Sequence, residues 1–380
     1  MTQPDALDWT TIESQLPADY VSRAARRKLV KPKLPKHLGA KVTHIGQILR
    51  VVLYQVARNI GQQPAAAAFA AAGLLRISHV TLHQWMKKLG GYLAELVALM
   101  VEERHAAFAP ERWAGRELIL VDATCVQRPG AKGTTSRIHR ALRLTDLRVV
   151  SAEVTDHRGG ETFKRFSPCK NQLWLGDRCY ANPPGIAWMK DHEADVLVRY
   201  NRGALPLYDA KGCAIDVLGK LAKLRKPGRS REWRVFVHRE KDKRDECIQG
   251  RLCAVRLPKD KADQARARLR REHDGPLTAE SLAMADFVVV FTTVPRHEMS
   301  FEHVMELYRM RWQIELDFKR DKSTTGLDLL PNFLPETIES WIYAKLLLHQ
   351  IARKLADSGS AIPPSAVADA LAPAHQQQAA

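Results

Sequence analysis

The feature that most restricts the fold of this chain is a series of strand patterns between residues 117 and 201. Runs of apolar residues, separated by turn residues, predict three consecutive strands, then a helix, a strand, a second helix and a fifth strand. The five predicted strands are ELILVDATCV, RIHRALRLT, LRVVSAEVTD, QLWLGD and DVLVRYN. The first three follow one another at hairpin spacing, whereas helices separate the last two and predict parallel crossovers. The chain is therefore predicted to be an α/β protein.

This order of elements is the opening of a ribonuclease-H-like fold, in which an antiparallel meander precedes strand–helix crossovers. We assign residues 113–202 to the first part of such a core. The pattern then breaks over residues 203–285, where short alternating strands and a basic helix predict a basic, mostly β insertion. Residues 286–357 complete the core with the strand DFVVVFTTV and two long helices, the first from about Ser300 past Lys322 and the second from about Pro335 to Leu355.

Helices are predicted before this core. Residues 1–41 are first acidic and then basic, and we interpret them as a flexible arm, either a solvated linker or a segment that contacts phosphates. Residues 42–112 predict a helical DNA-binding domain. Within it, an alanine-rich helix, a turn at Gly73 and a short helix ended by Gly90 are typical of a helix-turn-helix, although a plain helical bundle has the same apolar spacing. The second helix would present to DNA the residues His79, Thr81, His83, Gln84 and Lys87.

The charge of the chain indicates a polyanionic partner. The 380 residues include 59 Lys and Arg against 42 Asp and Glu, a net charge of +17, and residues 220–273 alone carry +11 of it. Such an excess is typical of proteins that bind nucleic acid. Within the insertion, a solvated helix face and lysines on edge strands would account for part of the charge.

Several classes of protein are excluded. No apolar run reaches the ~20 residues of a membrane span, so no membrane partner is expected. The first residues lack the basic and apolar regions of a secretory signal. Six cysteines without a CxxC pair exclude a disulfide scaffold or an obvious zinc module and favour a reducing cytoplasm. The Ala-, Pro- and Gln-rich residues 358–380 predict a disordered tail.

Two aspartates follow apolar strand segments. Asp122 follows LILV, and Asp177 follows LWLG. A single carboxylate in such a place is ordinary, but a buried carboxylate without a partner is costly. Because the first and fourth strands of this fold lie side by side, we expect the two carboxylates to converge.

A stripe of polar residues lies on the helix YRMRWQIELDFKRDK. Tyr308, Arg311, Glu315 and Lys322 stand at offsets of 0, 3, 7 and 14 and fall within about 60° of one another on a helix. The alternative is an ordinary i,i+4 ion pair between Arg311 and Glu315 on a solvated helix. Three carboxylates on two strands and a helix suit two Mg²⁺ ions, which support phosphodiester displacement, and the basic companions suit phosphate groups.

The spacing of these four residues matches a known pattern. Tyr308-x2-Arg311-x3-Glu315-x6-Lys322 resembles the Tyr-Arg-Glu-Lys signature of bacterial insertion-sequence transposases of family four. Those proteins are DDE enzymes with a ribonuclease-H-like core and a β insertion before the glutamate. The segments VDATCV, GDRCY and TTV resemble further blocks of the family, so that the resemblance covers roughly residues 117–350.

The resemblance implies roles for individual residues. It implies a metal-binding catalytic triad made of Asp122, Asp177 and Glu315. It implies a second set that holds the phosphates of the transposon ends, made of Tyr308, Arg311 and Lys322. The implied cofactor is Mg²⁺, for which Mn²⁺ can substitute.

The function that the resemblance implies is cut-and-paste DNA transposition. The expected partners are double-stranded DNA at terminal inverted repeats and target DNA, with a dimer of the chain in the DNA end complex. Two alternatives stay open: a non-catalytic DNA-binding transposase derivative, and a nuclease of the same fold without strand transfer. An intact set of three carboxylates argues against the derivative.

The chain departs from the family pattern in two places. Cys179 stands where the family usually has a glycine, two residues after its second aspartate. Some members stack a flipped base on a tryptophan in the strand before the glutamate helix, and here that strand offers only Phe287 and Phe291.

Overall fold

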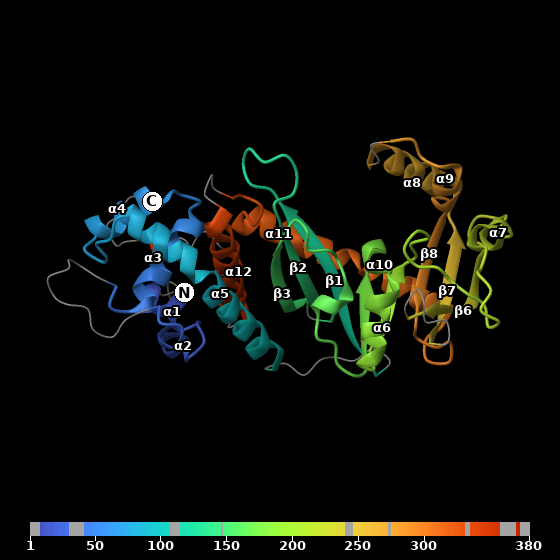
Figure 1. Cartoon of the computed structure of the whole chain (residues 1–380), viewed down its shortest axis with the longest axis horizontal. Helices are drawn as coiled ribbons and strands as arrows, with labels where there is room; N and C mark the ends of the chain where they lie inside the picture. The colour runs from blue at the N-terminus through green and yellow to red at the C-terminus, as the bar shows by residue number, and fades with distance from the viewer. Residues whose placement is uncertain are drawn as a thin grey trace, which may run out of the picture.

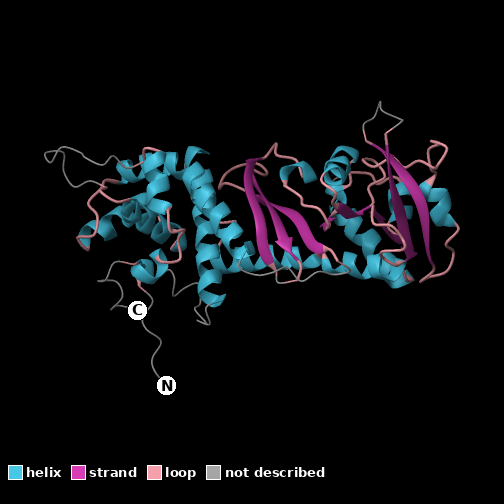
Figure 2. Cartoon of the chain, turned by 90° about the horizontal axis from the view of Figure 1, so that it is seen from below, coloured by secondary structure: helices cyan, strands magenta, loops and turns pink. Residues whose placement is uncertain are grey.

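The fold centres on a mixed sheet of eight strands with helices on both faces (Figure 1, Figure 2). This computed structural model describes residues 8–29, 42–106, 115–145, 147–239, 246–272, 275–330, 335–357 and 370–372. Helices gather at one end of the molecule around α5 (His79–Ala106) and α12 (Pro335–Asp357), and the strand β6 (Ser230–His238) lies at the other end. Among the described residues, no helix combines the length and apolarity that a membrane crossing requires.

The sheet contains the predicted meander and crossovers. Its other strands are β1 (Glu117–Val126), β2 (Ser136–Arg143), β3 (Arg148–Asp156), β4 (Gln172–Gly176), β5 (Asp195–Arg199), β7 (Cys247–Arg256) and β8 (Phe287–Thr292). Their order is β3-β2-β1-β4-β5-β8-β7-β6. β1, β2 and β3 pair antiparallel, whereas β4 runs parallel to β1 and β5 parallel to β4. The predicted order of the first five strands is therefore confirmed, and the α/β fold is consistent with a ribonuclease-H-like domain.

Local sequence sets several of the helix ends. The remaining helices are α1 (Trp9–Glu13), α2 (Tyr20–Arg26), α3 (Ile45–Ala57), α4 (Gln62–Ala71), η1 (Phe163–Arg165), η2 (Arg178–Tyr180), α6 (Pro183–Asp191), α7 (Val217–Ala222), α8 (Lys259–Glu272), α9 (Ala279–Met284), α10 (Phe301–Met310) and α11 (Trp312–Thr325). Asn182 caps α6, because its side chain accepts the N–H of Gly185 while Pro183 occupies the first turn. Ser300 caps α10 in the same way through the N–H of His303.

The alternation of side chains along each strand gives the sheet a core on each face. Leu118 and Leu120 of β1 belong to the core that α5, α11 and α12 share. Ile119 and Val121 belong to the opposite core, which α6 covers. α11 contacts β1, and α10 contacts β5. The layers therefore bring α11 onto β1 and α10 onto β5, the two strands on either side of β4.

The first helices differ from the predicted flexible arm. Residues 8–29 form α1 and α2, and four buried apolar side chains recur every fourth residue: Ile12, Leu16, Tyr20 and Ala24. The basic half is engaged as well, since Arg23 and Arg27 both pair with Glu95 of α5. The regular apolar spacing is the sequence signal of a packed segment, and the charge pattern obscured it. Residues 1–7 and 30–41 lie outside the described part of the chain.

The helix expected to end at Gly90 continues for a further sixteen residues, to Ala106. Gly90 lies against α12, and a Cβ atom there would stand 2.9 Å from Cδ of Glu339. The glycine therefore allows two helices to approach closely, and their packing outweighs its low helix propensity. The turn at Gly73, where φ is +70°, joins α4 to α5 as predicted, but the second helix is long rather than short.

The segment 203–285 is less rich in strands than predicted. It contains the strands β6 and β7 and the helices α7, α8 and α9, so that helices account for more of its described residues than strands do. β7 pairs antiparallel with β8, and β8 pairs antiparallel with β5. The hairpin thus extends the central sheet. The basic helix that the sequence predicts is α8, whose Ala, Arg and Lys residues favour a helix.

Part of the C-terminal tail is packed. Residues 370–372 are buried, and the Arg50 side chain of α3 donates a hydrogen bond to the carbonyl of Ala372 (3.2 Å). The prediction of a disordered tail is wrong for these three residues, because their apolar side chains join the core around α3. The other residues of 358–380 lie outside the described part of the chain.

Candidate active site

The pairing of β1 with β4 brings the two strand aspartates side by side. Leu120 of β1 pairs with Leu175 of β4 in parallel register. Asp122 and Asp177 each follow two residues later. Asp122 Oδ1 accepts the N–H of Ala123 (2.9 Å). The two predicted carboxylates therefore converge beyond the last paired residues of these strands.

Asp122 is the most perturbed of these carboxyls. Burial raises its pKa from the ordinary 3.8 to about 7, and the N–H of Ala123 opposes that shift. The negative charges of Asp177 and Glu161 raise the pKa further, whereas the positive charge of Arg311 lowers it. At neutral pH this group is therefore poised to hold either a proton or a cation.

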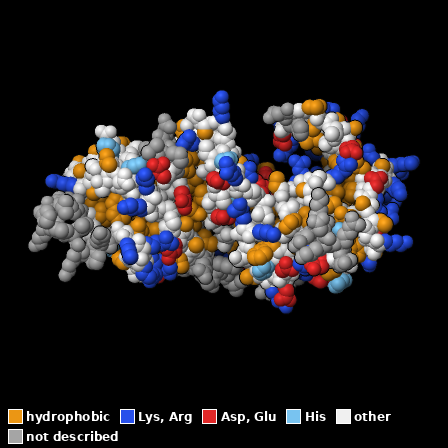
Figure 3. Space-filling view, in the orientation of Figure 1, with side chains coloured by type: hydrophobic (Ala, Val, Ile, Leu, Met, Phe, Trp, Pro, Cys, Tyr) orange, Lys and Arg blue, Asp and Glu red, His pale blue; other side chains and the backbone are white. Residues whose placement is uncertain are grey.

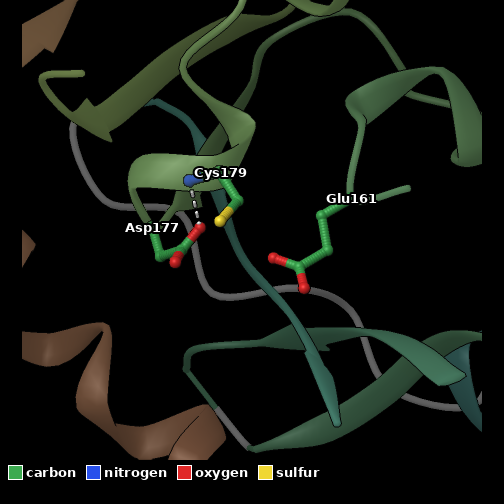
Figure 4. Close-up of side chains that lie close together, drawn as sticks. All are labelled: Glu161, Asp177 and Cys179. Carbon is green, nitrogen blue, oxygen red and sulfur yellow. Dashed lines mark hydrogen bonds between the residues drawn. The ribbon is translucent and has the colours of Figure 1, made fainter. Parts of the chain in front are cut away.

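Glu161 is a further carboxylate that the sequence reasoning missed. It lies between β3 and η1, and its carboxylate stands within 4.8 Å of donor atoms of Asp177 and Cys179 (Figure 4). Burial raises its pKa, and Asp177 raises it further. Glu161 lies in the segment HRGGETFKRF, neither at a strand end nor on a helix stripe, so no periodicity marked it.

The helix that carries the glutamate is broken at Arg311. α10 ends at Met310 and α11 begins at Trp312, and the N–H of Arg311 donates to the carbonyl of Tyr308, three residues back (3.2 Å). The predicted long helix is therefore present as two helices that join at Arg311, whose own φ of −54° and ψ of −29° stay in the right-handed helical region. The guanidinium of Arg311 is largely buried and is attracted by Tyr308, Glu315 and Asp122.

Arg311 links the glutamate to the strand carboxylates. Its Nη2 donates to Glu315 Oε1 (2.6 Å), and it also forms a hydrogen bond with Tyr308. The i,i+4 ion pair considered from the sequence is therefore present. It is not a solvated pair, because the Arg311 side chain is only 17% exposed and also acts on Asp122. The structure brings Tyr308, Arg311 and Glu315 into contact with one another, and Arg311 lies close enough to Asp122 to lower its pKa.

Lys322 lies at the far end of the same stripe. It follows Glu315 by seven residues on α11, which places it on the same helix face about 10 Å further along the axis. Within the described residues, no hydrogen bond or ion pair joins it to Tyr308, Arg311 or Glu315. Lys322 therefore lies on the predicted polar face of the helix, but it is not in contact with Tyr308, Arg311 or Glu315.

Arg199 is a second residue that the sequence reasoning missed. This arginine ends β5, donates to the carbonyl of Phe287 (3.2 Å) and forms a hydrogen bond with Tyr308. Burial lowers its pKa, and the positive charges of Arg178 and Arg311 lower it too. The sequence signal that could have identified Arg199 is an arginine at the end of an apolar strand. Arg178, Arg199 and Arg311 thus lie close to one another, and Arg311 also acts on Asp122.

A buried cation holds α11 on the sheet. Arg140 of β2 pairs in register with Asp122 of β1 and is fully buried. Its Nη1 lies 2.6 Å from a carboxylate oxygen of Asp317 and 2.6 Å from one of Asp321, both on α11. Its Cζ stands 4.7 Å from the ring centroid of Phe318. The helix of Glu315 is therefore fastened beside the strand that carries Asp122.

Helix α12 completes this network from the other side. Arg353 pairs with Asp317, and Nδ1 of His349 lies 2.6 Å from Asp321. The two carboxylates of α11 thus each have a partner on β2 and a partner on α12. This arrangement fixes the orientation in which α11 presents Glu315.

The family of the chain follows from comparison with known proteins. Residues 113–351 match the family model of the transposase DDE domain, which is more than half of the chain. The chain therefore belongs to this family. The predicted resemblance to insertion-sequence DDE transposases is confirmed at that level.

Relatives of the chain include insertion-sequence proteins. The chain is 34% identical over 238 residues, 61% of its length, to the putative transposase InsL for insertion sequence element IS186A of Escherichia coli (strain K12) and to the transposase for insertion sequence element IS421 of Escherichia coli. The match spans 64% of the length of each relative. A shorter match, 38% identical over 68 residues, covers 18% of this chain and 14% of the transposase for insertion sequence element IS231F of Bacillus thuringiensis subsp. israelensis.

Proposed function

We propose that this chain is a DNA transposase that cleaves phosphodiester bonds at transposon ends and joins those ends to target DNA. The observation that carries the proposal is the convergence of Asp122 and Asp177, with Arg311 linking Asp122 to Glu315. Family membership and the insertion-sequence relatives support the same reaction. We extend the proposal to the Tyr-Arg-Glu-Lys group, family four, because all four signature residues are present at its spacing.

The residues of the site fit a divalent metal. Asp122, Asp177 and Glu315 offer hard oxygen donors, which Mg²⁺ and Mn²⁺ prefer. The raised pKa of Asp122 fits a position where a cation replaces a proton. When bound, two such ions would activate the attacking oxygen and stabilise the leaving oxygen. The three carboxylates would hold the ions, and the network around Arg140 fastens the helix that presents Glu315.

The basic side chains of the site would hold the DNA strand. Arg311 can grip a phosphate with two hydrogen bonds, whereas Lys322 acts as a point charge further along α11. Arg199 and Arg311 both bond Tyr308, so that the phenol is oriented from two sides. A phosphate would compete with Glu315 for Arg311, which would release the glutamate to the metal.

A groove beside α5 supports DNA binding by the N-terminal helices. It lies between the end of α2 and the start of α5, and its lining is Arg27, Lys28, Leu29, Thr81, Gln84, Trp85 and Lys88. Thr81 and Gln84 are two of the residues that the sequence predicts to face DNA. Basic side chains around a tryptophan suit a nucleic-acid strand. We therefore assign DNA binding to residues 42–112 and include the packed helices of residues 8–29 in that unit.

The remaining parts of the proposal concern organisation and partners. We propose that residues 113–202 and 286–357 form the catalytic core, that residues 203–285 form a basic extension of it, and that the chain acts on terminal inverted repeats as a dimer. A cytoplasmic location, with access to chromosomal DNA, is part of the same proposal.

The experiment that tests this function is a cleavage and joining assay. Purified chain is incubated with labelled DNA that carries the sequences flanking its gene, in Mg²⁺ and separately in EDTA. We expect nicked and joined products in Mg²⁺ alone. Nicking without joined products would favour a nuclease, and DNA binding without either product would favour a non-catalytic derivative; both results contradict the proposal.

A further inference from the structure

The turn after β4 places a thiol beside two carboxylates. Asp177 caps the short helix η2, and its Oδ1 accepts the N–H of Cys179 (2.7 Å). This turn brings both side chains to the same side, where the Glu161 carboxylate meets them (Figure 4). One donor atom from each residue lies within 4.8 Å of the others. Cys179 is also the position at which the chain departs from the glycine of its family pattern.

A buried hydroxyl lies close enough to the same cluster for its charged groups to act on it. Tyr180 is fully buried, with its ring centroid 5.1 Å from that of Phe163. Within the described residues its hydroxyl has no hydrogen-bond partner. The charged and polar groups that act on it are those of Glu161, Asp122, Asp177 and Cys179. A buried hydroxyl without a partner costs free energy, so this one indicates a ligand at the cluster with which it could bond.

We propose that Glu161, Asp177 and Cys179 form a site for a thiophilic divalent cation of the zinc class, separate in its ligands from the magnesium site of the proposed function. Mg²⁺ takes oxygen ligands, whereas a thiolate together with carboxylates selects Zn²⁺ or its soft analogue Cd²⁺. Zn²⁺ commonly takes four ligands at about 2.0–2.3 Å. The three side chains supply three of them after small rotations, and a water bonded to the Tyr180 hydroxyl supplies the fourth. Binding releases the thiol proton to solvent.

This site shares Asp177 with the proposed catalytic metal site, and the following consequence rests on the proposed function. An ion held by Glu161 and Cys179 withdraws Asp177 from the magnesium ions. Zinc therefore inhibits strand cleavage, through a cysteine that the family pattern lacks. The chain thereby acquires a sensitivity to soft metals.

The binding test uses the full chain without DNA. Metal-stripped protein is titrated with Cd²⁺, and the cadmium–thiolate charge-transfer absorbance in the ultraviolet is recorded for the wild type, Cys179→Ser and Glu161→Gln. Cys213→Ser is the matched control, because Cys213 is another exposed free cysteine. We expect saturable absorbance at one equivalent that Cys179→Ser removes and that Cys213→Ser retains. Glu161→Gln should weaken Cd²⁺ binding by roughly 10- to 100-fold.

Two results would overturn the site: unchanged absorbance in Cys179→Ser, or unchanged Cd²⁺ affinity in Glu161→Gln. Circular dichroism of each variant confirms that the fold is retained. A second assay adds Zn²⁺ to the Mg²⁺-dependent cleavage reaction, where we expect Cys179→Gly to resist zinc better than the wild type, and equal inhibition would overturn the inhibitory consequence. A wild type that never cleaves would overturn the proposed function, while the cadmium titration would still decide the metal site.

Discussion

The surroundings of Asp122 indicate the chemistry of the candidate active site. A carboxyl on a strand would normally face solvent or pair with a base, yet here burial and two neighbouring carboxylates hold its pKa near 7. The only opposing charge among those acting most strongly on it is that of Arg311. Such an arrangement is unfavourable for a metal-free protein and favourable for a metal-loaded one.

The first prediction concerns the three carboxylates. Asp122→Asn, Asp177→Asn and Glu315→Gln should each lower the strand-cleavage rate more than about a hundredfold, because the amides keep the shape but lose the charge that binds the metals. DNA affinity should survive in all three. Glu306→Gln is the control, since Glu306 is exposed on α10. If a variant keeps more than about a tenth of the wild-type cleavage rate, the residue that it replaces is not part of the triad.

The second prediction concerns pH. Because the folded-state pKa of Asp122 is raised, the metal-free folded chain keeps a proton that the unfolded chain has lost between about pH 4 and pH 7. The free energy of unfolding should therefore decrease as the pH rises through that window, by at most about 4 kcal/mol from this group. Urea unfolding in EDTA at pH 5 and pH 8 measures this decrease in the free energy of unfolding.

Asp122→Asn should reduce this pH dependence. It should not remove it completely, because the pKa of Glu161 is raised as well and contributes in the same direction. Saturating Mg²⁺ should stabilise the wild type more at pH 8 than at pH 5. If the metal-free wild type became more stable toward pH 8, the assigned protonation of Asp122 would be wrong.

The third prediction concerns Arg311. Arg311→Ala should weaken end binding or cleavage by roughly 10- to 150-fold, because a charge-assisted hydrogen bond to phosphate is worth about 1.5–3 kcal/mol. Arg311→Lys should recover only part of the loss, since it cannot bind a phosphate with two parallel hydrogen bonds. Arg309→Ala, an exposed arginine of the same helix, is the control. If Arg311→Ala bound and cleaved DNA at near-wild-type levels, the only role left for Arg311 would be its ion pair with Glu315.

At the scale of elements, the position of α11 depends on the cation beneath it. The fourth prediction is that Arg140→Met lowers the free energy of unfolding by about 3–5 kcal/mol, because Asp317 and Asp321 would keep buried charges without their shared partner. The triple variant with Asp317→Asn and Asp321→Asn should recover a large part of the loss. Urea denaturation measures both.

A surface ion pair provides the comparison for this prediction. Lys170→Met removes an exposed partner of Glu193 and should cost less than about 1 kcal/mol. If Arg140→Met were equally mild, the network would not hold α11 in place. In the triple variant the free energy of unfolding should be largely restored, but the cleavage rate should still fall. The reason is that the network would no longer fix the orientation in which α11 presents Glu315.

The sequence predicts elements where a local pattern decides the structure. The continuous apolar runs of β1 and β4, together with the order of the elements around them, are enough to place Asp122 and Asp177 on adjacent strands. The change of hydrogen bonding at Arg311 involves its near neighbours Tyr308 and Glu315 as well as the distant Asp122. The continuation of α5 through Gly90 depends instead on a partner far away in the sequence. Glu161 and Arg199 were missed for the same reason, because only the folded chain brings them to the site.

At the scale of the whole molecule, charge collects at the end opposite the N-terminal helices. Figure 3 shows Lys and Arg side chains gathered around the part of the molecule formed by β6 and α7–α9. On α8, Arg270 and Arg271 are exposed, whereas Arg268 pairs with Glu272. This end is separated from the groove beside α5 by the whole sheet, so that a bound DNA would lie along the length of the molecule.

The fifth prediction tests this path. Replacing Arg270 and Arg271 by alanine should lower the slope of log affinity against log salt by up to about 1.8, since each phosphate contact contributes about 0.9. Lys170→Ala is the control, because Lys170 precedes β4 at the end of the strand opposite Asp177. DNA affinity is measured by fluorescence anisotropy at several salt concentrations. An unchanged slope in the double variant would remove α8 from the DNA path.

The close packing of α5 against α12 has a consequence for how the chain is made. The Ser340 side chain on α12 donates to the carbonyl of Met86 on α5, 254 residues earlier. A ribosome that adds about 5–20 residues per second needs roughly 13 to 50 seconds to span that distance. During this time the part of α5 that packs against α12 is not covered by that helix, although α2, α3 and α4 already contact α5 elsewhere. The first helices to be synthesised therefore acquire their finished surface only when the last one emerges, and a chain whose translation stops before residue 335 lacks a completed N-terminal core.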